Sequence, residues 1–470
     1  MVFSSIPFMF VFFPIVLGIY YALPRKWRNV WMLITSLLFY AWGEPIYILI
    51  MLFSTVFDYV NGRLIEKYQS DPKTEHRAKY VVLVSIIINL GILAFFKYTD
   101  FFIENFRLIP GLAWLKPLGL TLPIGISFYT FQTLSYTIDV YRGDAKAQKR
   151  IVPFGAYVTL FPQLIAGPIV RYKTVAEQLN HRQENYRQFY CGITKFTVGL
   201  GKKVLLANSI GSLFDYTKAL PQSEMSVALS WLGILAYGFQ VYFDFSGYSD
   251  MAIGLARMFG FEFEENFNYP YISKSITEFW RRWHISLGTW FREYVYIPLG
   301  GNRVSKWKHV RNIMIVWMLT GFWHGAAWNF LLWGVYFGIV LLIEKFFLAK
   351  WLKKLPAAVS HLYALFMIAV GWTVFAFDDM AKLGVYLKNM FFANGLPLFN
   401  QQLLYALSNY GLMLIILVIA STPLMFKLYD RLREKRWMPA VVCVLVVCGL
   451  VLSTAYLVDA SYNPFLYFRF

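Results

Sequence analysis

Residues 81–96 read VVLVSIIINLGILAFF, a run without a single charged side chain. Similar apolar runs recur at residues 8–19, 313–319, 331–343 and 412–420. Runs of this kind, separated by polar breaks, fit repeated crossings of a bilayer, each of which takes about 20 residues. Because lipid offers the backbone no hydrogen-bonding partner, the sequence predicts an all-α, polytopic membrane protein. A β-barrel would show alternating residues instead of solid runs.

Composition supports the same class. The 470 residues are 58% hydrophobic and only 15% charged, whereas a soluble domain carries about a quarter charged residues. The pattern predicts about 11–12 transmembrane helices in one bundle. We place the crossings near residues 7–23, 29–43, 46–61, 79–96, 119–141, 191–210, 227–256, 310–327, 328–346, 357–376, 406–426 and 438–458.

The net charge of +18 would suit a nucleic-acid partner, but its distribution argues against one. Most of the 44 lysines and arginines fall in clusters between the apolar runs. The positive-inside rule places these clusters in the cytoplasm, so both termini are predicted outside it. We therefore expect the lipid bilayer as a partner and no nucleic acid. The clusters are residues 25–28, 63–79, 142–150, 171–203, 274–311, 345–354 and 427–436.

Two segments depart from the crossing pattern. Residues 151–170 lie between two basic clusters and contain Pro162, Gly167 and Pro168, so we expect a re-entrant turn. Residues 261–311 are rich in Trp, Tyr and Arg and should form interfacial helices and a funnel on the cytoplasmic side. No repeat or long linker divides the chain, which predicts one integral-membrane domain over residues 1–470, ending in an extracytoplasmic tail at 459–470.

Polar residues inside a membrane protein are costly and are candidates for function. His324 lies in an apolar crossing among tryptophans, with Gly321 and Gly325 beside it. Burial keeps an imidazole neutral, which is the form that a general base needs. His324 is therefore either a general base or a core histidine bonded to a neighbouring helix. The three cysteines have no metal or disulfide spacing, and we expect no metal site.

Three further sets leave two interpretations open. His284 positions a substrate or serves as a second acid or base, or else it is a structural histidine of the interface. Asp244 and Asp250 either relay protons or bind ions, or they pair with basic residues inside the bundle or accept hydrogen bonds from Tyr and Ser. The cations Lys274, Arg281 and Arg282 either bind phosphates or mark the cytoplasmic interface by snorkelling.

Four motifs together resemble the membrane-bound O-acyltransferase (MBOAT) family. They are LPIGISFY at residues 122–129, YFDFSGYSD at 242–250, WRRWHISL at 280–287 and WHG at 323–325. The resemblance runs over essentially the whole chain and is strongest to the bacterial branch that O-acetylates alginate and peptidoglycan. It implies a helical bundle around a central tunnel.

The resemblance also implies roles for residues. His324 matches the catalytic histidine of the family, and His284 the second histidine of the bacterial branch. The acyl donor would be acetyl-coenzyme A, with no tightly bound cofactor, and its phosphates would contact Arg281, Arg282 and Lys274. The expected lining of the tunnel is Trp280, Trp283, Trp323, Asp244, Ser246 and Asp250.

The final residues, FLYFRF at 465–470, resemble the C-terminal motif of this branch and the tail of a small protein that accompanies a teichoic acid D-alanyl transferase. By that resemblance, Tyr467 is a candidate acetyl carrier, since a phenol can act as a nucleophile once a base removes its proton. The resemblance implies an extracytoplasmic SGNH-type acetyltransferase as partner, an exported or cell-wall polysaccharide as final acceptor, and the bacterial inner membrane as location.

Three other functions remain open. The first is D-alanyl transfer to teichoic acids. The second is transport of a glycan or acyl intermediate, which Asp244, Asp250 and the histidines would serve as a proton path, although no repeated halves are visible. The third is a scaffold that docks an export machine, in which His324 would be replaceable.

Overall fold

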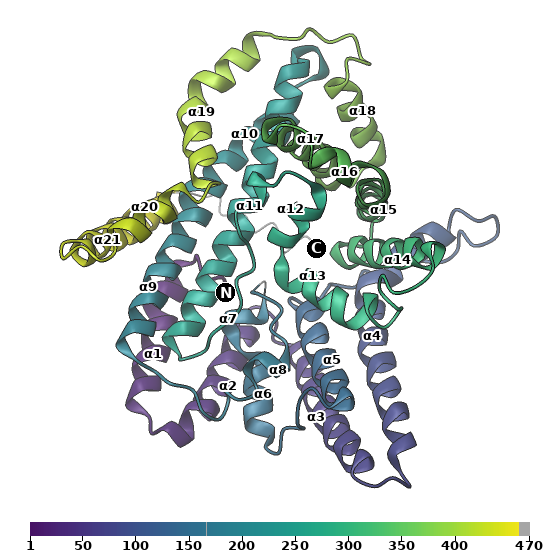
Figure 1. Ribbon diagram of the computed structural model, residues 1–470, viewed down its shortest axis with the longest axis vertical. Helices are drawn as coiled ribbons and strands as arrows, with labels where there is room; N and C mark the ends of the chain where they lie inside the picture. The colour runs from purple at the N-terminus through teal and green to yellow at the C-terminus, as the bar shows by residue number, and fades with distance from the viewer. Residues whose placement is uncertain (166, 460–470) are drawn as a thin grey trace. The chain divides into compact units, whose positions relative to one another are not determined.

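The computed structural model describes residues 1–165 and 167–459, and within these ranges the chain forms helices and no strand (Figure 1). Six helical segments are long and apolar enough to cross a membrane, which confirms the all-α, multi-pass class. They are α3 (Ile48–Gln69), α4 (Glu75–Phe106), the segment Trp328–Leu352 that joins α15, η6 and α16, α17 (Ala357–Ala376), α19 (Gln401–Ala420) and α21 (Met438–Asp459).

The other predicted crossings coincide with helices that are shorter or more polar. Residues 8–22 form η1 and α1, for example, and residues 227–256 lie within one long helix, α11. The bounds are η1 (Phe8–Phe12), α1 (Phe13–Ala22), α2 (Arg25–Ala41), α5 (Ile126–Arg142), α9 (Tyr186–Gly201), η2 (Lys202–Ala207), α10 (Asn208–Ala219), α11 (Val227–Met258) and α14 (Lys306–His324).

The chain divides into two compact units. The first unit comprises Met1–Phe196 and Ser249–Glu264, and the second comprises Thr197–Tyr248 and Glu265–Phe470.

In the first unit, a buried carboxylate joins three helices. Asp58 of α3 is fully buried and accepts hydrogen bonds from Ser85 Oγ at 2.7 Å and Asn89 Nδ2 at 2.8 Å, both on α4. Ser85 Oγ also lies 3.2 Å from Thr137 Oγ1 of α5. A charge inside the bundle is tolerated because several donors surround it.

The segment predicted to re-enter the membrane is broken into α6 (Ile151–Thr159) and α7 (Phe161–Leu164), with Leu160 in a non-helical conformation (φ −50°, ψ 109°) between them. Nine residues of helix span only about 14 Å, half of the roughly 30 Å of a hydrocarbon core. Neither piece is therefore long enough to cross, as a re-entrant segment requires. The α8 turn (Tyr172–Val175) follows.

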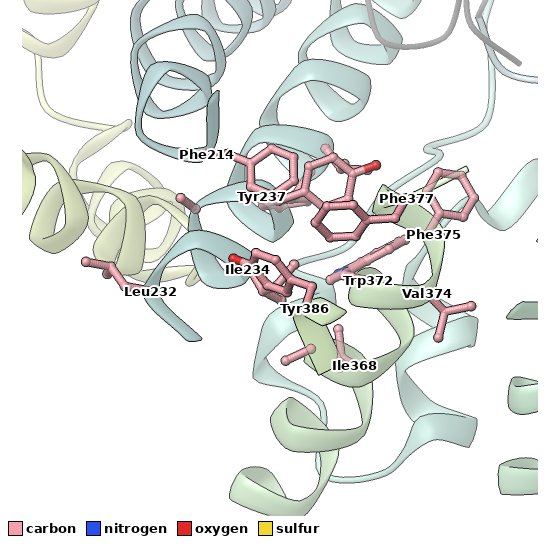
Figure 2. Packing of buried hydrophobic residues seen from close by; sticks show 14 of the residues in the cluster. Phe214, Leu232, Ile234, Tyr237, Ile368, Trp372, Val374, Phe375, Phe377 and Tyr386 are labelled. Carbon is pink, nitrogen blue, oxygen red and sulfur yellow. The ribbon is translucent and has the colours of Figure 1, made fainter. Parts of the chain in front are cut away.

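The second unit has an aromatic core (Figure 2). Trp372, Phe375 and Phe377 come from the end of α17 and the residues after it, and Phe214 of α10 packs on Tyr237 of α11 with ring centroids 4.6 Å apart. This core surrounds the C-terminal end of α17. Helix α18 (Met380–Met390) also contributes to it. The second unit further contains η3 (Gln222–Glu224) and α20 (Leu424–Leu432).

Residues 265–305 of the second unit form short helical pieces instead of one long helix. They are η4 (Pro270–Ile272), α12 (Ile276–Arg282), α13 (Ile285–Phe291) and η5 (Arg292–Tyr296). Their side of the membrane stays a prediction.

Helices α14 and α15 (Trp328–Ile343) lie side by side (Figure 1). They meet at Gly321 and Gly334, where a Cβ built on Gly321 would lie 3.2 Å from the Gly334 Cα. Paired glycines let helix backbones approach closely. This close crossing fixes the position of the C-terminal end of α14, where His324 lies.

Candidate active site

A cavity of about 1150 Å³ opens within the second unit. Its walls come from α12, α13, η5, α14, α15, η6 (Glu344–Leu348), α16 (Ala349–Leu352) and the start of α17. Both candidate catalytic histidines, His284 and His324, line it. Residues 40 positions apart in the sequence are thus brought to one cavity, as two groups acting on one substrate require.

Cations dominate the charged part of the wall. The basic lining residues include Lys274, Arg281, Arg292, Lys345 and Lys353.

The two carboxylates of the wall are already engaged within the protein. Glu278 accepts from Arg282 at 2.9 Å and from the Lys274 backbone N–H at 3.0 Å. Glu344 accepts from the first turn of α12. The cavity is therefore suited to an anionic ligand.

His324 is the last residue of α14 and is 6% exposed. Three aromatic rings enclose its imidazole, with centroids 5.1 Å away for Trp323, 5.2 Å for Trp333 and 5.4 Å for Phe375. Thr320, one turn earlier on the same helix, also lines the cavity. The imidazole is therefore enclosed by aromatic rings at the C-terminal end of α14.

His284 lies between α12 and α13 in a left-handed backbone conformation, with φ of 44° and ψ of 54°. Few residues other than glycine adopt this conformation, so the surrounding contacts must hold it. Phe245 packs against its ring at 4.7 Å, edge to face. Burial lowers the pKa of the His284 imidazole to about 3, so this side chain is neutral at physiological pH.

The predicted donor contacts and tryptophans divide into two groups. Lys274, Arg281, Trp280 and Trp283 line the cavity with the histidines. Arg282 is instead ion-paired with Glu278 and donates to the Asn268 carbonyl at 3.1 Å. Trp323 packs against both histidine rings, 6.1 Å from that of His284 and 5.1 Å from that of His324, but is not among the lining residues of this cavity.

The aspartates lie in ion pairs. Asp244 contacts Lys203 at 2.7 Å, with both side chains at most 3% exposed. Asp250, in the first unit, contacts Lys195 at 3.1 Å. Ser246 is buried, and neither it nor Asp244 is among the cavity-lining residues of the described part of the chain. Tyr467 lies outside the described residues.

Several residues of the site were not predicted from the sequence. Glu344 and Arg292 line the cavity, and Asn266 contacts His284. Glu344 could have been found, because it is an acid at the end of a long apolar run. The sequence around Asn266 has no comparable feature that would indicate a role in the site. Within the described ranges, no group of three or more His, Cys, Asp or Glu could hold a metal ion.

Comparison with known proteins identifies the family. Residues 25–377 match the membrane-bound O-acyltransferase family, MBOAT. A probable alginate O-acetylase AlgI of Azotobacter vinelandii is 44% identical over 81% of this chain and 76% of its own length. A peptidoglycan O-acetyltransferase of Helicobacter pylori is 35% identical over 85% of this chain and 81% of its own.

A teichoic acid D-alanyltransferase of Bacillus subtilis is a more distant relative, 34% identical over 49% of this chain and 60% of its own length. The matched family region contains His284, His324 and every described lining residue of the cavity between them. The chain belongs to the membrane-bound O-acyltransferase family and is an acyltransferase.

Proposed function

We propose that this protein takes an acetyl group from cytoplasmic acetyl-coenzyme A and passes it across the membrane for O-acetylation of an exported or cell-wall polysaccharide. The observation that best supports the proposal is that His284, His324 and a cluster of cations line one and the same cavity. Acetyl-coenzyme A offers both matching parts, a phosphorylated nucleotide for the cations and a thioester for the histidines. The names of the relatives, which O-acetylate alginate or peptidoglycan, support an acetyl group.

The donor would enter with its phosphates against Lys274, Arg281 and the neighbouring cations of the wall. Arginine and lysine both bind phosphate through charge-assisted hydrogen bonds. The pantetheine arm would then reach inward past Trp280, which also lines the cavity. This orientation brings the thioester toward His324.

The transfer step needs one base and one acid. His324 takes the proton of an acceptor hydroxyl as its oxygen attacks the thioester carbonyl. A C–O bond forms, the C–S bond breaks, and the proton ends on the sulfur of the released coenzyme A thiol. In one version of this step, His324 passes to the sulfur the proton that it took from the hydroxyl, and His284 orients the donor. In the other version, His284 gives the sulfur a proton and regains one when His324 releases the proton that it took. The aromatic rings around His324 exclude water that would hydrolyse the thioester.

The acceptor hydroxyl in this scheme is that of Tyr467, which would carry the acetyl group as an aryl ester. A partner of the SGNH acetyltransferase type, outside the cytoplasm, would discharge that ester to the polysaccharide. This relay places the protein in the bacterial inner membrane with both termini outside the cytoplasm. Resemblance of the FLYFRF tail to that of related systems supports the relay.

The direct test is mass spectrometry of the purified full chain after incubation with labelled acetyl-coenzyme A. The expected result is label on Tyr467 in the wild type, and none on the chain in Tyr467→Phe. Transfer to polysaccharide that persists in Tyr467→Phe, without label on the wild-type residue, would rule out the relay.

The histidines are tested separately. His324→Ala should fold and lose transfer by about a hundredfold or more, the range of a lost general base. His76→Ala is the matched control, because His76 is exposed in the first turn of α4. Normal transfer in both His284→Ala and His324→Ala would refute this function. Uptake of a glycan without acyl transfer would indicate a transporter, and preference for a D-alanyl donor would indicate the teichoic acid reaction.

A further inference from the structure

Asn266 contacts three consecutive residues of the turn that carries His284. Asn266 is 1% exposed and lies in the loop between α11 and η4. Its side-chain Oδ1 accepts from Ser286 N–H at 3.1 Å and from Ser286 Oγ at 2.9 Å, and it lies 3.3 Å from His284 Nδ1. Its backbone carbonyl accepts from Ile285 N–H at 2.9 Å. One buried asparagine thus holds the whole turn.

These contacts fix the tautomer of His284. The Ser286 backbone N–H can only donate, so the Asn266 atom that it meets is the amide oxygen. An amide oxygen only accepts, so the His284 Nδ1 that contacts it must carry the hydrogen. A neutral imidazole has one N–H, which makes Nε2 the nitrogen with the lone pair.

The backbone of His284 explains why such a contact is needed. Its φ of 44° is costly for a side chain with a Cβ, by about 1–3 kcal/mol. The hydrogen bonds that Asn266 accepts from Ile285 and Ser286 hold the turn in this conformation. Phe267, the neighbour of Asn266, stacks on the His284 ring with centroids 6.4 Å apart.

We propose that Asn266 is the positioning residue of His284 and that it assigns His284 the role of hydrogen-bond acceptor toward the donor. This inference rests on the proposed function and decides between its two roles for His284. With its hydrogen on Nδ1, His284 accepts at Nε2, for which the amide N–H groups of the pantetheine arm are the matching chemistry. The Nε2 of His284 then has no proton to give to the thiolate. His324 therefore returns to the sulfur the proton that it took from the hydroxyl.

The electrostatic surroundings agree with a neutral imidazole. Phe245, Phe267 and Trp323 pack against the ring from α11, the loop and α14, and none of these side chains carries a charge. Burial lowers the pKa of His284 to about 3. The charged or titratable side chains that share the cavity wall with it are Lys274, Glu278, Arg281, Arg292, Tyr296, His324, Glu344, Lys345 and Lys353.

The test is the pH dependence of transfer by the full chain in Asn266→Asp. A carboxylate keeps the accepting oxygen but adds a negative charge beside the imidazole, which favours its protonated form. Protonation at Nε2 removes the acceptor. We therefore expect the acidic limb of kcat/KM for acetyl-coenzyme A to move to higher pH by about one unit or more. A residue that only stabilised the fold would not shift this limb.

Asn389 provides the matched control. It is 2% exposed and pairs with Gln222 at 3.0 Å, and it does not line the cavity. Asn389→Asp should leave the pH profile unchanged. Asn266→Leu, which removes the acceptor, should lower kcat/KM for acetyl-coenzyme A at least tenfold. If that variant does not elute as a folded species, Asn266→Asp decides alone.

Two outcomes separate this inference from the function on which it rests. A wild-type profile in folded Asn266→Asp, while His284→Ala and His324→Ala are impaired, would overturn the positioning role only. Unimpaired transfer in both histidine variants would overturn the proposed function itself.

Discussion

Glu344 caps α12 from another helix, because its carboxylate accepts a hydrogen bond from the Ile276 backbone N–H at 2.5 Å. The same carboxylate accepts from Thr277 N–H at 2.9 Å and from Thr277 Oγ1 at 2.8 Å. The first N–H groups of a helix have no partner within it, and here a buried acid supplies one. Helix α12 then carries Trp280 and Arg281 along the cavity and leads to His284.

Glu344→Ala should therefore destabilise the protein and weaken donor binding together. Two buried N–H groups lose a charged acceptor, and each such bond is worth about 1.5–3 kcal/mol. We expect a lower thermal midpoint in detergent and a higher KM for acetyl-coenzyme A. Glu344→Gln keeps an accepting oxygen and should recover part of both losses.

Glu434→Ala is the control for this experiment, since Glu434 is exposed after α20. It should change neither the midpoint nor the KM. An unchanged midpoint in Glu344→Ala would contradict the capping role.

The sequence predicted the helical class because the bilayer leaves few alternatives to a helix. Apolar runs such as residues 81–96 fall inside spanning helices, here α4. The pair Pro162 and Gly167 marked the segment that breaks into α6 and α7. What the pattern did not contain is the buried network of Asp58 with Ser85 and Asn89, because such contacts depend on how three helices pack.

The site was predictable where its chemistry is unusual in lipid. His324 stood out as an imidazole in an apolar crossing, and His284 through the motif around it. The supports of the site were not predictable, since Asn266 contacts His284 from 18 positions away and Glu344 contacts Ile276 from 68 positions away. Their function depends on hydrogen-bond geometry, which composition and spacing do not encode.

The buried ion pair of Lys203 and Asp244 makes a second prediction. Both side chains are at most 3% exposed, and Lys203 also donates to Asn208 Oδ1 at 2.9 Å. Removing one partner of a buried pair costs about 3–5 kcal/mol, because the other charge stays buried. Asp244→Asn and Lys203→Met should each lower the unfolding free energy by about that amount.

A double-mutant cycle measures the coupling of this pair. Lys203→Met combined with Asp244→Asn should be more stable than either single variant, since no lone charge is left. The exposed pair of Arg433 and Asp430, each at least half exposed, is the comparison. Asp430→Asn should cost about 0–1 kcal/mol. Additive losses in the Lys203 and Asp244 cycle would show that the two side chains do not interact.

The glycine crossing of α14 and α15 makes a third prediction. A Cβ on Gly321 would overlap the Phe330 carbonyl oxygen and approach Gly334. Backbone atoms cannot move aside as a side chain can, so Gly321→Ala should push α14 away and displace His324. We expect loss of transfer of about tenfold or more, since small displacements of catalytic groups have effects of this size.

Gly384→Ala is the matched control, because a Cβ at Gly384 of α18 meets no atom within 4 Å. Alanine there should be neutral or stabilise the helix by about 0.5–1 kcal/mol. Full transfer activity in Gly321→Ala would mean that the crossing does not position His324.

The pKa of His284 makes the last prediction, on stability against pH. Its folded value of about 3 lies below the ordinary value of 6.5. Between these values the unfolded chain binds a proton that the folded protein does not, so this side chain makes stability fall as pH decreases from 6.5 toward 3. The slope from this residue approaches about 1.4 kcal/mol per pH unit.

His284→Asn removes that titration and suits the left-handed backbone, which asparagine tolerates better than most residues. The thermal midpoint of the wild type should therefore drop more steeply than that of the variant when pH is lowered from 7 to 5 (a range chosen to span the ordinary pKa). Above pH 7 the two curves should run parallel, because His284 is neutral in both the folded and the unfolded chain. Parallel curves over the whole range would mean that His284 is not buried in its neutral form, and the acceptor role assigned to it would then lose its physical basis.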